Sequence, residues 1–459
     1  MDAPNRPIIP PAPPVHAKDL NVWQLVRGMT SNIAGVWAER HFDELTTRGR
    51  VLGQDSILLG DPADARAVLA DRSGTYARPA AFIRPIRPLG GAGVLLAEGD
   101  EWKRQRRMLA PLFSPTRVGD LIPHFAAAAD NLVNRLAGQG RANLSAEFHR
   151  TALDAVMRAL FSMQVDDDRS GMAAMVRQYI AGPGRPTVFD GMARRENDFT
   201  PWLGGRRRRF QKAWFAQVDA LVAQRRASGQ AGHGDLLDLL LAVRDPETGE
   251  GLDNAEIRDQ CATMLVAGFE TTSRLLFWAV YLLALDPLEQ TRIRAEVTAH
   301  PPEGVNSLED LAAWPRLRQT LFEALRLYPP VAVLIREIKR PVTIAGHAMT
   351  KGALAWVSPW VMHRHRKFWD NPTAFMPDRF AGKPQAYLTE EAFLPFAAGP
   401  RICIGASFSI AEASVLLARL LTKYELSLES AAPVLPVSTV TTAPDHEPWF
   451  KLEPTTPLP

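Results

Sequence analysis

Apolar residues recur every three to four positions along most of this chain, and that spacing is typical of amphipathic or buried α-helices. The longest such pattern covers residues 254–285, where a largely apolar helix is expected to carry a polar kink at its middle. Other helices are predicted at roughly 100–112, 118–137, 144–163, 167–181, 203–228, 287–299, 314–327 and 406–421. The pattern therefore predicts a mainly α fold.

Strand patterns occupy only a few segments. Residues 51–60 are typical of short strands, and residues 342–360 alternate in the manner of a β-hairpin. Two further segments contain the prolines and glycines that interrupt regular structure. Residues 76–99 are expected to form a long irregular loop, and residues 182–200 begin with a Gly-Pro-Gly-Arg-Pro break. The proline-rich residues 1–20 predict an extended N-terminal arm.

Composition describes an ordinary soluble globular protein. The chain has 459 residues, of which 46% are hydrophobic and 22% charged, and its formal net charge is +3. This weak charge, without a basic stretch interleaved with aromatic residues, does not indicate nucleic-acid binding. No apolar run is long enough for a membrane span, and the N-terminus lacks a secretory signal pattern. Cys261 and Cys403 are too far apart for a disulfide framework or a metal knuckle, so a cytoplasmic protein is expected.

The most informative motif lies near the C-terminus, in the run Phe396-Ala397-Ala398-Gly399-Pro400-Arg401-Ile402-Cys403-Ile404-Gly405. Its glycines allow backbone N–H groups to approach the cysteine sulfur, and the following helix N-terminus and Arg401 favour the ionised thiol. Such a thiolate is suited to bind iron, and Phe396 is placed to pack against a flat cofactor. A lone cysteine is more often a small buried residue, so this interpretation depends on the whole pattern.

A second unusual segment, Ala267-Gly268-Phe269-Glu270-Thr271-Thr272, lies inside the long apolar helix. Glycine, an acid and two β-branched hydroxyl residues are unfavourable there. Gly268 would leave room for a flat cofactor, while the Thr271 hydroxyl can bond the carbonyl one turn back or release it for a ligand. Taken alone, the segment is better explained as a helix kink with Glu270 paired to an arginine. Beside the cysteine motif, a functional interpretation is favoured.

Together these motifs resemble the cytochrome P450 superfamily of haem-thiolate monooxygenases, soluble bacterial type, over about residues 55–426. The resemblance implies a single domain over residues 1–459, with a helix-rich body and a smaller β-rich side. It also implies haem b between the long central helix and the cysteine loop. Cys403 would be the axial iron ligand, with Phe396 beside the ring and Arg401 beside a propionate. Glu270 and Thr271 would conduct protons to the oxygen that is being activated.

Further motifs of that family are matched. Trp102 and Arg106 correspond to W-x-x-x-R, and Arg336 to an arginine after the Tyr-Pro-Pro turn, so all three are implied to bind haem propionates. Arg106 could instead belong to the solvated face of a basic helix. Glu323 and Arg326 match the E-x-x-R motif, and Arg379 is the arginine of the P-x-R-F motif. The resemblance implies that these three residues form a buried ion-pair network that holds the cysteine loop.

The substrate pocket implied by the resemblance has walls from the central helix, the segment after Pro330 and residues 76–99, with residues 182–200 as a lid. Its expected wall residues are Ala267, Thr271, Val331 and Val333. His363 and His365 lack partners at metal-ligand spacing and are assigned to packing or surface positions.

The implied activity is insertion of one atom of O₂ into an apolar organic substrate, such as a fatty acid or hydrocarbon. Electrons would come from NAD(P)H through a separate ferredoxin or flavodoxin and its reductase. Glu270 and the Arg-Leu-Tyr-Pro-Pro-Val segment resemble fatty-acid and hydrocarbon hydroxylases more than terpene hydroxylases. Two alternatives remain open. One is an H₂O₂-driven peroxygenase, which usually lacks the Glu270–Thr271 pair; the other is a non-catalytic haem or gas-binding protein, which needs no proton delivery.

Overall fold

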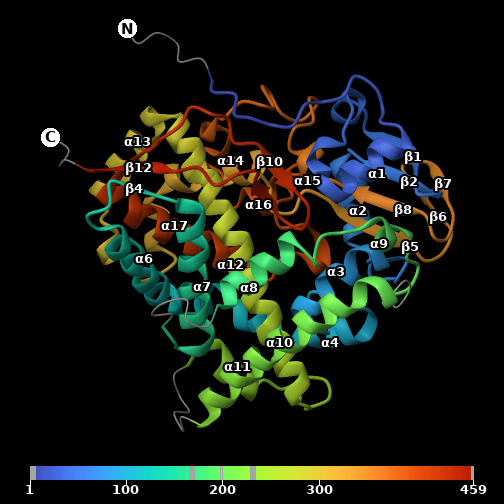
Figure 1. The fold of residues 1–459 in the computed structure, drawn as a ribbon, viewed down its shortest axis with the longest axis horizontal. Coiled ribbons are helices and arrows are strands. Elements are labelled where there is room, and N and C mark those ends of the chain that lie inside the picture. Colours follow the sequence, from blue (N-terminus) through green and yellow to red (C-terminus); the bar gives the residue numbers. More distant parts are fainter. Residues whose placement is uncertain (1–6, 165–170, 197, 199, 228–233, 456–459) are drawn as a thin grey trace.

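Helices make up most of the molecule (Figure 1), in a computed structural model that describes residues 7–164, 171–196, 198, 200–227 and 234–455. The α-helices are α1 (Val22–Ser31), α2 (Pro62–Leu69), α3 (Ala80–Gly90), α4 (Gly99–Leu109), α5 (Pro115–Asp120), α6 (Ile122–Leu136), α7 (Leu144–Phe161), α8 (Met172–Ala181), α9 (Val188–Met192), α10 (Thr200–Ala227), α11 (Leu236–Ala242), α12 (Asn254–Leu285), α13 (Pro287–Ala299), α14 (Pro315–Leu327), α15 (Pro359–Met362), α16 (Ala386–Thr389) and α17 (Ala406–Lys423). The predicted mainly α character is confirmed.

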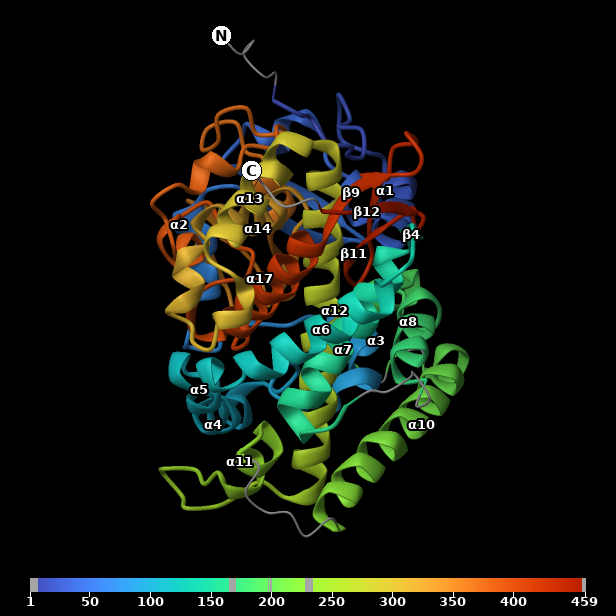
Figure 2. The same cartoon turned by 90° about the vertical axis from the view of Figure 1, so that its left-hand side faces the viewer.

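Helix α12 passes through the middle of the molecule in both views (Figures 1 and 2). It begins with a capping box, in which the Asp253 side chain accepts from the Glu256 N–H, and continues without a break to Leu285. Its second half is almost completely buried, and it packs against α3, α7, α14 and α17. The helix predicted over 254–285 is therefore confirmed, and the segment where a kink was expected stays helical.

Most strands of the largest sheet lie on one side of the helical body, near α1 and α2, whereas β4 and β12 lie on the other side (Figure 1). The largest sheet has the order β1-β2-β8-β5-β3. Its strands are β1 (Thr46–Val51), β2 (Gln54–Leu59), β8 (Leu354–Val357), β5 (Leu334–Ile338) and β3 (Tyr76–Ala77). Only β2 and β8 pair in parallel, and the other neighbours are antiparallel. This sheet positions β5, which carries Arg336, beside the cysteine loop region.

Three smaller sheets complete the β structure. Strands β9 (Tyr424–Leu428), β12 (Phe450–Pro454) and β4 (Arg141–Ala142) form one sheet, and β10 (Pro436–Ser438) pairs with β11 (Thr442–Pro444). The hairpin predicted over 342–360 is confirmed only for its first part, where β6 (Val342–Ile344) pairs with β7 (His347–Met349). The later residues join the largest sheet as β8 and then form α15, because their fully buried side chains need cover on both faces.

The loop expected over residues 76–99 is wrong for its central part, which forms helix α3 in spite of Pro85 and Pro88. Side-chain donors from other helices bond its carbonyl groups. The Tyr179 hydroxyl donates to Pro85 O at 2.7 Å, and the Trp214 indole N–H donates to Leu89 O at 2.8 Å. Its apolar face, including Leu89, is buried. Tertiary packing therefore outweighs the local signal of the prolines.

In its described part, the predicted N-terminal arm forms no helix or strand from residue 7 to residue 15; residues 1–6 lie outside the described residues. It lies along the body, where Ile8 O accepts from Phe375 N at 2.8 Å and Pro11 O accepts from the Tyr328 hydroxyl at 2.7 Å. Within the described ranges, no helix combines the length and the apolar character that crossing a lipid bilayer would require.

Candidate haem-thiolate site

The cysteine loop is held by its own backbone. Cys403 N donates to Phe396 O at 2.9 Å, and Ile402 N donates to Gly399 O at 3.0 Å. Gly399 has φ 71°, and a Cβ there would lie 2.6 Å from Leu69 O at the end of α2. Only glycine allows both this backbone conformation and this approach. Ala397 also has positive φ, at 62°, in a position where the alanine side chain makes that conformation costly.

Cys403 is exposed to solvent, although protein atoms surround it closely enough that burial raises the pKa of its thiol. The backbone N–H of Gly405 and the positive charge of Arg106 lower that pKa, but by less. The sequence predicted that Arg401 would supply this stabilising charge. That prediction is wrong, because the Arg401 guanidinium lies against other partners. Its guanidinium donates to Glu98 at 2.7 Å and lies 4.1 Å from the centre of the Trp102 ring.

Three arginines gather around one carboxylate beside this loop. Glu98 pairs with Arg78 at 2.9 Å and with Arg401 at 2.7 Å. Arg336 lies close to the same group, and burial followed by repulsion from Arg78 lowers its pKa to about 10. Burial and Arg78 also lower the pKa of Arg401 to about 10. The cluster therefore has more positive than negative charge, and a bound anion would stabilise it.

The sequence analysis missed Arg78. Its side chain is only 10% exposed, whereas the prolines and glycines around it predicted an exposed loop. It directly follows β3 and bonds Glu98, which lies beyond helix α3. A weak signal was available, since Ala77-Arg78-Pro79 follows a short strand pattern, but the contact itself depends on the fold.

Trp102 and Arg106 both lie on α4. Trp102 packs against Arg401, and Arg106 lies near Cys403, so both are near the cysteine loop, where the W-x-x-x-R match predicted them. The Arg106 side chain is half-buried and makes no hydrogen bond with the residues that the structure describes. Burial lowers the pKa of its guanidinium, and the nearby Cys403 opposes this shift. An uncommitted guanidinium beside the sulfur is available to an anionic group of a ligand.

Ala267 and Thr271 lie one turn apart on α12. Both are accessible to solvent although most of their neighbours on the helix are buried. The Thr271 hydroxyl donates to Ala267 O at 2.7 Å, which is the back-bonded state considered from the sequence. These two residues therefore border an accessible space inside the helical body.

Gly268 requires a correction. A Cβ at this position would lie 2.8 Å from Val156 Cγ2 on α7. The glycine therefore allows α12 and α7 to approach each other, and it does not make room for a flat cofactor. The physical reason is the helical period, because a residue next to Ala267 points about 100° away from it.

Glu270 is completely enclosed and has three polar partners. Its carboxylate accepts from Thr441 Oγ1 at 2.8 Å and from Arg274 Nε at 3.1 Å, and it lies 3.2 Å from His149 Nε2. Burial alone would raise the pKa of Glu270, but Arg274 and His149 outweigh it and hold the pKa at about 2. Glu270 is thus an ionised acid in this conformation, and it makes no hydrogen bond with Thr271.

The structure brings Glu323, Arg326 and Arg379 together. Arg326 donates to both carboxylate oxygens of Glu323 at 2.7 Å, and Arg379 donates at 3.3 Å. The Arg326 and Glu323 side chains have no exposed area. Arg326 also donates to three backbone carbonyls, of His363, Pro372 and Ala374. This network ties α14 to the segment that leads into the cysteine loop.

His363 belongs to this network, although its sequence context suggested ordinary packing or a surface position. It is completely buried, and its Nε2 accepts from Leu394 N at 2.8 Å, two residues before Phe396. Burial, with the neighbouring Arg326 and Arg364, holds the pKa of His363 well below its usual range. A neutral imidazole therefore links the ion pairs to the cysteine loop. The long sequence separation left no local pattern that could have revealed this link.

These residues fit a haem. Cys403 offers one accessible sulfur, and a haem bound by a single cysteine thiolate needs only one such protein ligand. The arginine cluster suits the two propionates of such a ring. The accessible sulfur is suited to one face of the ring, and the accessible face of α12 is suited to the other. Fold and site together define a haem-thiolate protein with a helical body.

Comparison with known proteins agrees with this class. The family model for cytochrome P450 matches residues 10–446, and the chain belongs to the cytochrome P450 family. It is 31% identical to cyclooctat-9-en-7-ol 5-monooxygenase from Streptomyces melanosporofaciens, covering 74% of each protein. It is also 31% identical to cytochrome P450 4B1 from Rattus norvegicus, covering 74% of this chain and 70% of that protein.

The fold is likewise shared. The structure of the cytochrome P450DA heme domain superposes with a TM-score of 0.78 at 25% identity, and the match covers 98% of each chain. The predicted P450 fold, with its helix-rich body and smaller β-rich side, is thereby confirmed. The protein is an oxidoreductase of the P450 monooxygenase class.

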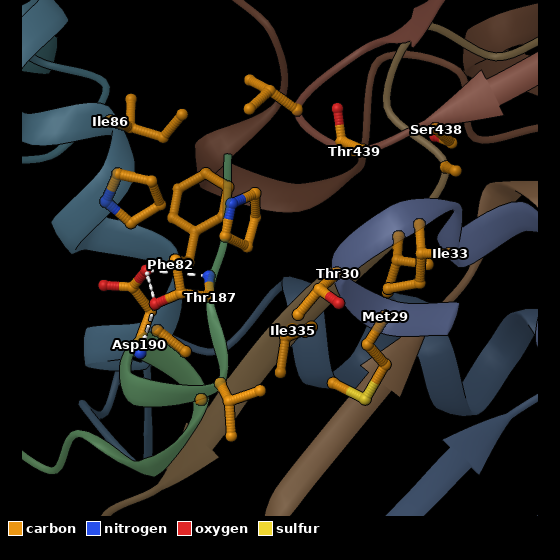
Figure 3. Close-up of a pocket in the computed structure, with 18 of the residues that line it drawn as sticks. Met29, Thr30, Ile33, Phe82, Ile86, Thr187, Asp190, Ile335, Ser438 and Thr439 are labelled. Atoms are coloured by element: carbon orange, nitrogen blue, oxygen red, sulfur yellow. Dashed lines mark hydrogen bonds between the residues drawn. The ribbon is translucent and has the colours of Figure 1, made fainter. Parts of the chain in front are cut away.

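Val331 and Val333, two of the predicted pocket walls, line an open pocket between α1, α3, α9 and β5 (Figure 3). Five residues of the predicted lid line it as well: Pro186, Thr187, Val188, Asp190 and Gly191. Ala267 and Thr271, the other two predicted walls, do not line this pocket. The expected substrate region is thus divided between this outer pocket and the accessible space beside α12.

Proposed function

We propose that this protein binds haem b through Cys403 and oxidises an apolar organic substrate with O₂, receiving electrons from a separate ferredoxin or flavodoxin and its NAD(P)H reductase. We further propose that residues 1–459 act as a single cytoplasmic domain. The family match over residues 10–446 supports the single domain. The observation that carries the proposal is the accessible Cys403 sulfur beside an arginine cluster with surplus positive charge.

The residues that would hold the haem are those of the cysteine loop and the arginine cluster. Cys403 would bind the iron, and Phe396 would pack on the ring. Four side chains, Trp102, Arg106, Arg336 and Arg401, would hold the propionates, and Arg78 joins them through Glu98. When bound, a thiolate-ligated haem supplies the activation of O₂.

Thr271 and Glu270 are proposed to manage protons. The Thr271 hydroxyl is exposed to the space beside α12 and has one partner, Ala267 O, which it can release. Glu270 is ionised and is the adjacent acid, so it can accept a proton and pass it on. To reach Thr271, the Glu270 carboxylate must give up its hydrogen bond with Thr441. This bond is the weakest of the three, because Arg274 carries a positive charge and His149 can carry one.

A labelled-oxygen experiment tests this function. Purified holoprotein is supplied with a surrogate ferredoxin, its reductase, NADPH and ¹⁸O₂, together with a panel of apolar compounds. The proposal predicts products that carry a single ¹⁸O atom. Turnover with H₂O₂ alone at the same rate as with the electron donors would favour a peroxygenase. Absence of product with every donor would favour a non-catalytic haem protein.

A further inference from the structure

Glu270 divides its hydrogen bonds unequally between its two carboxylate oxygens. Oε1 accepts from Thr441 Oγ1 at 2.8 Å and from Arg274 Nε at 3.1 Å. Oε2 lies 3.2 Å from His149 Nε2 and has no other hydrogen-bond partner among the described residues. The His149 and Glu270 side chains are each only 2% exposed. One carboxylate oxygen therefore faces one imidazole nitrogen inside the protein, almost out of reach of solvent.

The other ring nitrogen of His149 fixes where the protons of the ring lie. His149 Nδ1 lies 2.8 Å from Ser145 O, one turn back on α7. A carbonyl oxygen only accepts hydrogen bonds, so Nδ1 carries a proton and donates it. Glu270 is ionised in this conformation, and its Oε2 also only accepts, so the contact with Nε2 requires a second proton on the ring. His149 is therefore an imidazolium that donates to Glu270.

This arrangement decides in which form Glu270 can turn toward Thr271. If it turned as a carboxylate, three charges would remain unpaired, namely those of Arg274, His149 and Glu270. If the Nε2 proton passes to Oε2 first, both His149 and Glu270 become neutral and only Arg274 keeps an unpaired charge. Unpaired charges inside a protein are strongly unfavourable. Glu270 is therefore expected to turn as a neutral acid, and it then takes a proton with it.

The source of protons near Thr271 changes when an apolar substrate is bound. Ala267 and Thr271 border the accessible space beside α12, and water in that space can supply protons. An apolar molecule that fills the space displaces this water. A proton held on His149, on the neighbouring helix α7, does not depend on that water.

We propose that His149 is a positioning residue that acts through Glu270, by storing the proton that Glu270 carries to Thr271. In this step the Nε2–H bond breaks, its electron pair stays on the nitrogen, and an O–H bond forms on Glu270 Oε2. The neutral imidazole keeps its hydrogen bond from Nδ1 to Ser145 O. After delivery, Glu270 takes one proton from solvent water on the accessible side of α12 and returns it to Nε2. This inference rests on the proposed function and adds a residue to its proton path.

The protonation state of the His149 ring is the first test, and it needs no turnover. The holoprotein is labelled with ¹⁵N and ¹³C and studied by NMR at pH 7 as its reduced carbon monoxide complex, which is diamagnetic. The His149 ring is identified by its NOE to Phe269, since the two ring centres lie 6.4 Å apart. Both ring nitrogens should show the ¹⁵N shifts of an imidazolium. The shift of an unprotonated Nε2 would overturn the inference.

His149→Gln separates proton storage from hydrogen bonding. Glutamine keeps a neutral N–H donor for Glu270 but has no proton to give up. Haem content should match the wild type, while product formed per NADPH should fall by about tenfold. The ratio is measured with a compound that the labelled-oxygen experiment has shown to be oxidised. His124→Gln, which changes a half-buried histidine of α6, is the matched control and should keep the wild-type ratio.

Wild-type coupling in His149→Gln would overturn the inference, whatever the ¹⁵N result. If this variant loses its haem, the ¹⁵N shifts of the wild-type ring decide alone. The absorption spectrum of the same carbon monoxide complex reports whether the haem has a thiolate ligand. A failure of the proposed function would appear in that spectrum, and it is thereby distinguished from a failure of the role of His149.

Discussion

At the scale of single residues, the site depends on which charges lie near the Cys403 sulfur. Burial raises the pKa of its thiol, and Gly405 and Arg106 oppose this. Arg401 contributes little there because it already neutralises Glu98. The Arg106 guanidinium has no hydrogen-bond partner among the described residues, so it is available to the sulfur and to a bound anion. One arginine, Arg106, therefore lies near the sulfur, and the other three surround Glu98.

Thr271→Ala tests the proton-handling hydroxyl. The variant removes a group that bonds only a helix carbonyl, so folding and haem content should be preserved. Consumption of NADPH should continue, but most of it should yield H₂O₂, with product formation per NADPH reduced by about tenfold or more. The measurement is the ratio of product and peroxide to NADPH consumed. Thr271→Ser is the matched control and should keep most of the coupling; an unchanged ratio in the alanine variant would remove Thr271 from the mechanism.

Glu270→Gln tests the buried acid through its pH dependence. The folded pKa of Glu270 is about 2, below the usual 4.5, so its stabilisation is present above pH 4.5 and is lost as pH falls toward 2. This stabilisation is about 3 kcal/mol at neutral pH. The glutamine variant should be less stable at pH 7, and the difference from wild type in thermal unfolding should shrink between pH 5 and pH 3. Parallel curves at all pH values would contradict this role.

Residue-level prediction succeeded where a motif is local and failed where a contact is distant. The positions of Cys403, Glu323 and Arg326 follow from spacing within one loop or one helix. Gly268 was misassigned because a sequence motif does not say which neighbour a helical face meets, and here that neighbour is Val156. Arg78 and His363 were missed for the same reason, since their partners Glu98 and Leu394 are brought close only by the fold.

At the scale of elements, α14 and α17 each bury one glutamate, with opposite consequences. Glu323 on α14 accepts from Arg326, Arg379 and the Met376 N–H. Glu412 on α17 has no hydrogen-bond partner for either carboxyl oxygen within the described structure. Burial raises the pKa of Glu412 well above its usual range, and the nearby Thr272 offsets little of this rise. The first glutamate is therefore paired with two arginines, and burial favours the neutral form of the second.

The matched substitutions Glu323→Gln and Glu412→Gln distinguish the two. Glu323→Gln leaves Arg326 buried without its counter-charge, a loss of about 3–5 kcal/mol, and the protein should be recovered without haem. Glu412→Gln replaces one neutral group by another, so the free energy of unfolding should change by about 1 kcal/mol or less and haem should be retained. The measurement is the haem-to-protein ratio with thermal unfolding. Equal losses in both variants would refute the assigned protonation states.

Helices were predicted best where the apolar pattern continues over a long segment. Helix α12 has its predicted bounds, because many apolar residues support one helical period. Helix α3 was predicted as a loop, because Pro85 and Pro88 suppress the local signal while Tyr179 and Trp214 supply donors from other helices. Local propensity is a weak guide wherever packing supplies the missing partners.

At the scale of the whole molecule, the chain places three regions around one interior space. These are the cysteine loop, the accessible face of α12, and the open pocket between α1, α3, α9 and β5 (Figure 3). The ion-pair network of Glu323 holds the loop from behind. Separate parts of the fold are therefore proposed to hold the cofactor and to handle protons.

The central claim is that Cys403 binds the iron of a haem, and the absorption spectrum of the reduced protein under carbon monoxide tests it most directly. The wild-type protein should give the strongly red-shifted band of thiolate-ligated haem. Cys261→Ala, which changes the buried cysteine of α12, should keep that band, and Cys403→Ser should lose it. A wild-type spectrum without the red-shifted band, or a Cys403→Ser protein that retains it, would contradict the account.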